Sequence, residues 1–212
     1  MMQVYVSSIT PFLKGNIWKQ FVDRLDMERQ EKVMRTRNEK DQVRILAAGL
    51  LLQYAVEQEL DRKIPGTSLC IRQKEGGKPY LVDYPQIHFN LSHSGEMVAC
   101  AIGTIEVGVD IQQLVPVKEK VAARFFTEKE NERLRQCATA KEYEKQFFQY
   151  WCRKESYLKL TGEGLGGIAK LFLPHEIWEK QLDSYQLCVS MWEKEKVDFK
   201  EIHLDELLLT EK

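Results

Sequence analysis

The sequence predicts an α+β fold with two similar halves, and two observations carry this prediction. The expected elements follow the order strand, helices, strands, helices, strands. Each half also contains one long stretch with helical periodicity, over residues 39–60 and residues 140–160. A chain of 212 residues is long enough for one large domain or two smaller ones, and either arrangement buries enough surface for a stable core.

The first half is expected to begin with a strand and two helices. Residues 3–9 are typical of a strand, and residues 16–25 of a short amphipathic helix. The longer helix over residues 39–60 has a wide apolar face, and Arg44 lies at its polar edge.

A turn and several strands follow. Glycine and proline in the run Gly76-Gly77-Lys78-Pro79 indicate a turn. Apolar and polar residues alternate from residue 86, and the segment His93-Ser94-Gly95 is expected to turn the chain into a second strand over residues 97–102. A third strand over residues 105–111 would complete an antiparallel meander.

The second half is expected to be helical first and extended later. Helical patterns cover residues 118–137 and 140–160, and strand-like segments lie near residues 186–191 and 199–204. The glycine-rich run over residues 161–167 is the expected mobile loop. It lacks the glycine, lysine and hydroxyl spacing of a P-loop.

Composition excludes several classes of protein. A formal net charge of −1 with 30% charged residues argues against a globally basic nucleic-acid surface and against an acidic disordered tail. The five cysteines are odd in number and lack C-x-x-C spacing, which favours reduced thiols over a disulfide framework or a zinc site. The N-terminus lacks a signal-peptide pattern, and no apolar stretch has membrane-spanning length. The sequence therefore predicts a soluble, cytoplasmic protein that binds neither nucleic acid nor membrane.

One face of the helix over residues 140–160 changes from apolar to charged along its length. Four side chains recur every four residues and lie along one line of an α-helix: Phe147, Trp151, Glu155 and Lys159. An ordinary amphipathic helix would continue with apolar residues where this one places a carboxylate and an ammonium group. Charge within a buried face indicates a function, and the alternative is an exposed salt bridge at the helix end.

The strand over residues 105–111 has two different faces. Period-two alternation places Val107, Val109 and Ile111 on one face and Gly108, Asp110 and Gln112 on the other. Gly108 leaves room for a ligand or another backbone to approach closely. An Asp near a strand end is often only a turn former, but Asp110 together with Glu155 offers two carboxylates to one hard cation such as Mg²⁺.

Several polar and basic residues of the first half favour a phosphate ligand. Arg supplies a planar fork for phosphate oxygens, and Lys supplies a point charge. The candidates are Ser92, His93, Lys78, Arg44, Lys32 and Arg35. For any one of these basic residues a solvated helix face is the more common explanation, so the prediction depends on the whole set.

These motifs together resemble a known family. Gly108-Val109-Asp110, followed by Trp151-x-x-Lys154-Glu155-x-x-x-Lys159, is similar to the paired signature of the 4′-phosphopantetheinyl transferases. The segments Phe89-Asn90-Leu91-Ser92-His93-Ser94 and Gly77-Lys78-Pro79 resemble the longer Sfp type of that family. The order and spacing agree over residues 27–165, about two thirds of the chain.

The resemblance implies a fold and a reaction. The fold would be a monomeric pseudo-dimer of two α+β lobes, each an antiparallel sheet packed against a long helix. Residues 1–104 would form the coenzyme A-binding lobe and residues 105–212 the lobe with the metal site and the signature helix, with the active site in the cleft between them. The reaction would transfer the phosphopantetheine arm of coenzyme A to a serine of an acyl or peptidyl carrier protein and release adenosine 3′,5′-bisphosphate.

The resemblance also implies roles for individual residues. Asp110 and Glu155 would bind Mg²⁺, with Mn²⁺ as an alternative, and Glu155 would also accept the proton of the carrier serine. Lys159 would stabilise the pyrophosphate and the leaving phosphate, which completes a catalytic set with the two carboxylates. The coenzyme A ligands would be Ser92, His93 and Arg44 at the phosphates, Lys78 and Pro79 near the nucleotide, and Lys32 and Arg35 at its outer edge.

One position departs from the family pattern. The Sfp type commonly carries an acidic residue two positions after the signature Asp, where this chain has Gln112. An amide oxygen can still coordinate the metal, or a water can take its place, but one negative charge is lost. We therefore expect either weaker Mg²⁺ binding or a metal held mainly by Asp110, Glu155 and the pyrophosphate.

Other interpretations stay open at the level of sequence. A Mg²⁺-dependent hydrolase or transferase for another nucleotide diphosphate would use similar groups, and a noncatalytic carrier-protein or nucleotide-binding module would share the scaffold. Cys152 lacks a clear His partner and is expected to pack in the core rather than act as a nucleophile. The segments Val115-Pro116-Val117 and Arg124-Phe125-Phe126 fit a docking surface for a carrier protein or a helix start packed into the core. No motif distinguishes fatty acid, polyketide and nonribosomal peptide carriers.

Overall fold

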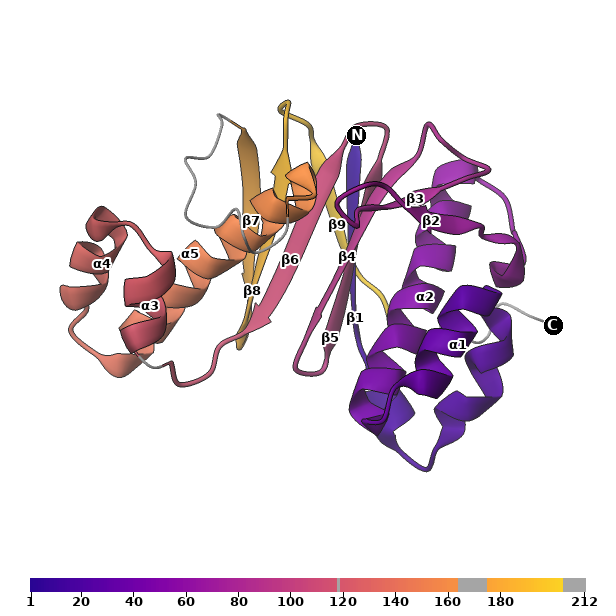
Figure 1. Cartoon of the computed structure of the whole chain (residues 1–212), viewed down its shortest axis with the longest axis horizontal. Coiled ribbons are helices and arrows are strands. Elements are labelled where there is room, and N and C mark those ends of the chain that lie inside the picture. Colours follow the sequence, from indigo (N-terminus) through magenta and orange to yellow (C-terminus); the bar gives the residue numbers. More distant parts are fainter. Residues whose placement is uncertain (118, 164–174, 204–212) are drawn as a thin grey trace.

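Two sheets lie at the centre of the computed structural model, and one long helix covers the outer face of each (Figure 1). The structure describes residues 1–117, 119–163 and 175–203. The first sheet has four strands in the order β4-β5-β1-β9: β1 (Met2–Ser8), β4 (His88–Ser94), β5 (Met97–Gly103) and β9 (Val197–Glu201). The second has three strands in the order β6-β8-β7: β6 (Val107–Gln113), β7 (Glu176–Leu182) and β8 (Tyr185–Met191).

The long helices are α2 (Glu39–Leu60) on the first sheet and α5 (Ala140–Thr161) on the second. The remaining elements surround them. The first half adds the 3₁₀ helices η1 (Thr10–Leu13), η2 (Ile17–Arg24) and η3 (Gly66–Ser68), the helix α1 (Met27–Arg35), and a hairpin of β2 (Ile71–Gln73) and β3 (Pro79–Leu81). The second half adds α3 (Glu119–Phe125) and α4 (Glu128–Arg135). No helix in the described ranges is long and apolar enough to cross a membrane.

Local sequence explains where both long helices begin and end. The side chain of Asn38 accepts a hydrogen bond from the backbone N–H of Asp41 at the start of α2. Thr139 does the same for Glu142 at the start of α5, and Gly162 ends that helix with a left-handed φ of 77°. Such side-chain caps satisfy backbone donors that have no partner within the helix, and glycine is favoured at the left-handed end.

The core has separate layers because β1 is buried on both faces. Val4 and Val6 pack between the two sheets, against Val109 of β6, while Tyr5 points the other way and packs under α2. Period-two alternation along one strand thus serves two hydrophobic layers.

Much of the predicted secondary structure is confirmed. The helix over residues 39–60 has the predicted bounds, the helix at 140–160 ends one residue later, and β1 and β8 lie on predicted strands. The α+β fold with a long helix on each of two sheets is also confirmed.

The short helix predicted over residues 16–25 forms as the 3₁₀ helix η2. Three other local predictions were wrong. The helix over residues 118–137 is two helices, because Thr127 and Glu130 form a capping box that starts α4. His93 and Ser94 belong to β4 rather than to the turn. The meander does not form, since β1 occupies the second edge of β5 and β6 pairs with β8 instead.

Two predictions concern segments at the edge of the described ranges. The strand near residues 199–204 is β9, which ends at Glu201 and pairs with β1 in parallel, so the second half of the chain adds a strand to the first sheet. Of the expected loop over residues 161–167, only 161–163 fall within the described part, and the rest lies outside it.

Candidate functional site

The two sheets meet where β4 and β6 lie side by side, and side chains rather than backbone groups join these strands. Alternate polar side chains of β4 accept hydrogen bonds from alternate backbone N–H groups of β6. The pairs are Asn90 with Val109, Ser92 with Ile111, and Ser94 with Gln113, at 3.2, 3.2 and 3.0 Å. This ladder fixes the register between the halves of the molecule and brings Ser92 beside Asp110.

Asp110 is the centre of a buried polar cluster. Its side chain is 2% exposed, and its Oδ1 accepts hydrogen bonds from Lys159 Nζ at 2.8 Å and Ser92 Oγ at 2.9 Å. Its Oδ2 accepts one from Gln112 Nε2 at 2.9 Å. Lys159 also donates to Ser92 Oγ at 2.8 Å. The predicted residues Asp110, Gln112, Ser92 and Lys159 therefore lie together.

A glycine allows α5 to reach this cluster. A Cβ atom on Gly108 would lie 2.0 Å from the carbonyl oxygen of Ser156 and 2.3 Å from the backbone nitrogen of Leu160, closer than any real contact. The prediction that Gly108 permits a close approach is confirmed, and the group that approaches is the backbone of α5. On the same helix Cys152 is fully buried and donates through Sγ to the carbonyl oxygen of Asp110 at 3.0 Å, as expected for core packing.

The face of α5 changes character as predicted. Phe147 and Trp151 stack with ring centroids 5.9 Å apart in the apolar core, while Glu155 and Lys159 line a cavity one and two turns later. Glu155 is half-buried, and its carboxylate has no hydrogen bond or ion pair in the described part of the chain. Burial raises the pKa of Glu155, the charge of Asp110 raises it further, and Lys159 opposes both. A cation beside the two carboxylates would relieve this repulsion.

The first cavity, of about 300 Å³, lies between the β2–β3 hairpin and the last turns of α5. Its lining residues are Gly76, Gly77, Lys78, Pro79, Asn90, Leu91, Glu155, Leu158, Lys159 and Gly162. Predicted site residues from both halves of the chain thus line the same cavity. Lys78 is only 8% exposed, because its ammonium group donates to the carbonyl oxygen of Leu160 at 2.7 Å and pairs with Glu106.

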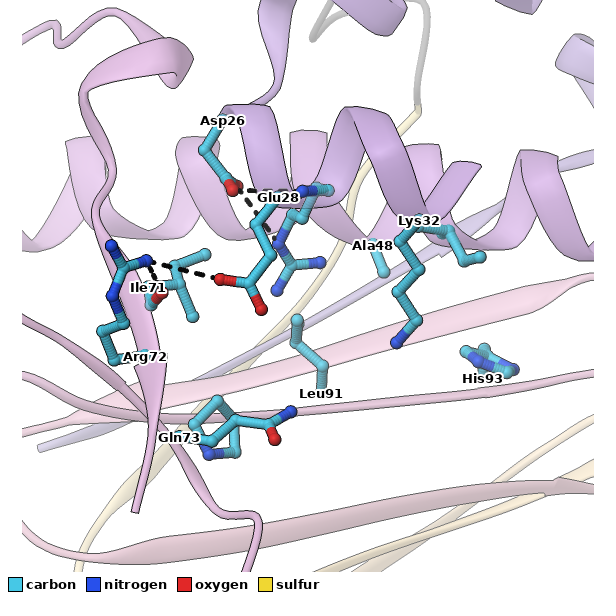
Figure 2. Close-up of a pocket in the computed structure, with 12 residues that line it drawn as sticks. Asp26, Glu28, Lys32, Ala48, Ile71, Arg72, Gln73, Leu91 and His93 are labelled. Carbon is cyan, nitrogen blue, oxygen red and sulfur yellow. Dashed lines mark hydrogen bonds and ion pairs between the residues drawn. The ribbon is translucent and has the colours of Figure 1, made fainter. Parts of the chain in front are cut away.

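The second cavity, of about 230 Å³, lies among α1, α2, β4 and the β2–β3 hairpin (Figure 2). It shares Pro79 and Leu91 with the first cavity, so the two are neighbours. Figure 2 shows Lys32 reaching from its helix toward the strand that carries Leu91 and His93. Lys32 has no ion pair among the residues that the structure describes, whereas Arg72 in the same lining pairs with Glu28 at 3.3 Å.

Electrostatics in the second cavity favour an anion. Partial removal from water lowers the pKa of His93, and the positive charges of Arg44 and Lys159 lower it further. Arg29 contributes another cation to the lining, with Asp26 as a neighbour at 3.6 Å. Because Asp26 and Glu28 pair with the two arginines of the lining, Lys32 supplies the excess positive charge that an anionic ligand would compensate.

Three predicted coenzyme A ligands line neither cavity: Ser92, Arg44 and Arg35. Ser92 is buried, and its hydroxyl is held on Asp110. Arg44 donates to the carbonyl oxygen of Gly95 through Nε at 2.9 Å and Nη2 at 2.7 Å, and its third nitrogen pairs with Asp41. Arg35 is 80% exposed at its side chain and pairs with Glu31 at 2.8 Å. Arg44 therefore supports the β4–β5 turn next to His93, and Arg35 lies on the outer surface of α1.

Sequence reasoning missed three residues of the site. Arg29 and Arg72 line the second cavity, and Glu106 pairs with Lys78 at the edge of the first. Asp26 at a helix start would have located α1 and with it Arg29, since its side chain accepts from the Arg29 N–H at 3.1 Å. No local sequence pattern marks Glu106 as a site residue, because the lysines that pair with it lie on a hairpin distant in sequence.

The fold and the site define a class of protein: two α+β halves whose seam carries two carboxylates, a lysine and two neighbouring cavities suited to an extended anionic ligand. Comparison with known proteins gives the family. The model described as the 4′-phosphopantetheinyl transferase superfamily matches residues 106–205, and the model for the N-terminal part of 4′-phosphopantetheinyl transferase matches residues 13–104.

Individual relatives agree with these models. The 4′-phosphopantetheinyl transferase gsp of Aneurinibacillus migulanus is 38% identical over 154 residues, 73% of this chain and 60% of that protein. Sfp of Bacillus subtilis strain 168 is 31% identical, over 69% of this chain and 64% of its own length. The transferase psf-1 of Bacillus pumilus is 30% identical, over 77% and 70%. The chain therefore belongs to the 4′-phosphopantetheinyl transferase family, and it spans less than two thirds of the gsp and Sfp proteins.

Proposed function

We propose that the protein transfers the 4′-phosphopantetheine arm of coenzyme A to a serine of an acyl or peptidyl carrier protein and releases adenosine 3′,5′-bisphosphate. The observation that carries the proposal is the contact of Lys159 and Ser92 with Asp110, on the family's signature positions and beside a cavity that Glu155 also lines. Family membership supports the same reaction. The proposal includes a cytoplasmic monomer with lobes over residues 1–104 and 105–212, in which β9 of the second part adds a strand to the sheet of the first.

The two neighbouring cavities support an extended substrate such as coenzyme A. Lys32 and His93 would bind phosphate in the second cavity, and Pro79 lies where the two cavities meet. Lys159 would face the pyrophosphate in the first cavity, where its ammonium group opposes the negative charge that grows on the leaving phosphate. Arg44 would act on the nucleotide through the turn it supports beside His93.

The proposal assigns residues to the proton transfer and to the leaving group of this reaction. The carrier serine oxygen attacks the phosphorus attached to the pantetheine arm, the bond from that phosphorus to the bridging oxygen breaks, and adenosine 3′,5′-bisphosphate leaves with the bond's electron pair. Glu155 would accept the serine proton, because its carboxylate is unpaired in the described structure and its pKa is raised by burial and by Asp110. Alignment and charge neutralisation matter more than a strong base in such a transfer.

Mg²⁺ belongs to the proposal, with Mn²⁺ as an alternative. In the described part of the chain no group of three or more His, Cys, Asp and Glu side chains could hold an ion. Asp110 and Glu155 would therefore hold it together with oxygens of the substrate, which suits the few protein ligands that Mg²⁺ takes. A bound ion would neutralise charge on the pyrophosphate. The amide nitrogen of Gln112 donates a hydrogen bond to Asp110, and its amide oxygen would be the atom that coordinates the ion.

Mass spectrometry of an apo carrier protein, incubated with coenzyme A and Mg²⁺, tests the function directly. We expect the carrier to gain the mass of one phosphopantetheine on serine with the wild type, and far less with Glu155→Gln. Release of nucleotide without a change in carrier mass would favour a hydrolase for another nucleotide diphosphate. Carrier binding without turnover at saturating coenzyme A would favour a noncatalytic module.

The structure separates the two interpretations of the segment before α4. Phe126 is buried and packs against Phe147, with ring centroids 5.0 Å apart, so it belongs to the core. Val115 and Arg124 are exposed, and Arg124 lies over the ring of Phe125 at 5.0 Å. We propose that these two exposed residues contact the carrier protein. Arg124→Glu should raise the Michaelis constant for the carrier and leave coenzyme A affinity unchanged. If the variant and the wild type have the same Michaelis constant for the carrier, Arg124 does not contact it.

A further inference from the structure

The tip of the β2–β3 hairpin packs directly against the end of α5. The turn between the strands is closed by hydrogen bonds from Lys74 N–H to the Lys78 carbonyl oxygen at 2.8 Å and from Gly77 N–H to the Lys74 carbonyl oxygen at 2.9 Å. A Cβ atom on Gly76 would lie 2.7 Å from the carbonyl oxygen of Gly162, so the two backbones almost touch. Gly76 has a φ of +94°, which only glycine adopts without strain.

Lys78 fastens this contact by capping α5. The carbonyl oxygen of Leu160 lies in the last turn of α5, where backbone carbonyl groups commonly lack an N–H partner within the helix. Lys78 Nζ donates to it at 2.7 Å, and a cation at a helix C-terminus is also favoured by the helix dipole. The lysine therefore ties the hairpin to the turn of α5 that carries Lys159.

Glu106, between β5 and β6, holds Lys78 in this place. Its carboxylate pairs with Lys78 and with Lys74 at 2.8 Å, and Nδ1 of His88 lies 3.4 Å away. Burial alone would raise the pKa of Glu106, but the hydrogen bonds from Lys74 and Lys78 lower it to about 2. Burial lowers the pKa of Lys78, and Glu106 counteracts this. The carboxylate thus keeps a largely buried ammonium group charged and aimed at α5.

The two parts joined in this way are opposite walls of the first cavity. Gly76, Gly77 and Lys78 line it from the hairpin, and Glu155, Lys159 and Gly162 line it from α5. We propose that Glu106 is a positioning residue: through Lys78 it clamps the hairpin to the end of α5 and so sets the width of the cavity that holds Glu155 and Lys159. The expected effect of Glu106 on coenzyme A binding rests on the function proposed above, whereas the contact between the hairpin and α5 does not.

The direction in which Glu106→Gln changes the affinity for coenzyme A distinguishes a positioning role from a purely electrostatic one. If Glu106 acted only through its charge, Glu106→Gln would strengthen binding of a polyanion, because a nearby negative charge is lost. If it positions the wall, the same change weakens binding severalfold. Glu75→Gln is the matched control. It removes one negative charge from the hairpin that carries Lys78, and Glu75 is exposed without a partner in the described structure.

Hydrogen exchange of the free protein tests the clamp without any substrate. We expect Glu106→Gln to speed amide exchange severalfold in residues 71–81 and 156–163 and to weaken coenzyme A binding in titration calorimetry, with Glu75→Gln like the wild type in exchange. Glu106→Asp, which keeps the charge on a shorter arm, should fall between them and serves if Glu106→Gln does not fold. Unchanged exchange, or tighter coenzyme A binding in Glu106→Gln, would overturn the proposal. If exchange rises in Glu106→Gln but neither the wild type nor any variant modifies a carrier, the clamp is supported and the proposed function is contradicted.

Discussion

The helices α2 and α5 are matched in length and caps but differ in what they bury. Each has 22 residues and starts with a side-chain cap, and each ends at a residue in the left-handed conformation. The buried residues of α2 are apolar apart from Glu57, whereas those of α5 include Cys152, Lys154 and Ser156. The length of a helix is thus set by its local sequence, and its function by the side chains on its inner face.

Every buried polar group named on α5 has a partner. Ser156 Oγ is hydrogen-bonded to Ser190 Oγ at 2.8 Å, Lys154 pairs with Glu130 at 3.1 Å, and Cys152 donates to the Asp110 carbonyl oxygen. Unpaired polar groups would be costly to bury, so these contacts offset the loss of water. The comparison predicts that changes beneath α5 affect activity, while changes beneath α2 affect stability alone.

The largest effect is expected from Asp110→Asn. The amide places a donor where Lys159, Ser92 or Gln112 now donates, so the cluster under α5 loses its charge and part of its geometry. We expect kcat/KM for carrier modification to fall on the order of 10²- to 10³-fold, as when one preorganised polar group is lost from an active site. Steady-state kinetics measures this. Activity within a few-fold of the wild type would show that the buried cluster is only structural.

Leu51→Ala tests the other helix. Leu51 is fully buried in the core under α2, and its truncation should lower the free energy of unfolding by about 2–5 kcal/mol. Urea denaturation measures this loss, and kcat per folded molecule should not change. A loss of kcat in the folded variant would break the contrast between the two helices.

A glycine pair gives a smaller but sharper comparison. Gly108→Ala places a methyl group against the backbone of α5, which cannot move aside, and should cost about 1–3 kcal/mol of stability together with activity. Gly49→Ala on α2 meets only side-chain atoms, Leu25 Cδ2 at 2.6 Å and Arg29 Cδ at 3.4 Å, which can rotate aside. Alanine also favours a helix by up to about 1 kcal/mol over glycine. Thermal melting and kinetics of both variants check the pair; equal losses at the two sites would contradict this explanation.

The smallest effect is expected from Gln112→Glu. A second carboxylate next to Asp110 adds negative charge at the proposed ion, so the Mg²⁺ concentration for half-maximal activity should fall, by less than about tenfold for one added ligand charge near the surface. Activity measured against Mg²⁺ concentration tests this. An identical Mg²⁺ dependence would exclude a role for residue 112 at the ion.

Local rules predicted the parts of the fold that depend on neighbours in sequence. The bounds of α2 follow from Asn38 and the apolar pattern after it, and the face of Asp110 follows from period-two alternation in β6. The break at Thr127 was equally local, since Glu130 completes its capping box, and it was missed because the helical pattern continues across it.

Pairings between distant segments could not be predicted in the same way. The partner of β6 depends on which strand edges are free. Because β1 pairs with the second edge of β5, β6 pairs with β8. Lys159 reaches Asp110 across 49 positions of sequence, and Lys78 reaches Leu160 across 82. For Asp110, Ser92 and Lys159 the family motifs supplied the grouping; for Glu106, which belongs to no motif, only the three-dimensional arrangement does.

The parallel pairing of β1 with β9 joins an early segment of the chain to a late one. Translation makes β1 before β9, so the outer edge of β1 stays unpaired until Val197–Glu201 has been made. A bare apolar edge is a template for pairing with other chains. A nascent chain that stalls before residue 197 therefore exposes an unpaired strand edge, which β9 covers once it has been made.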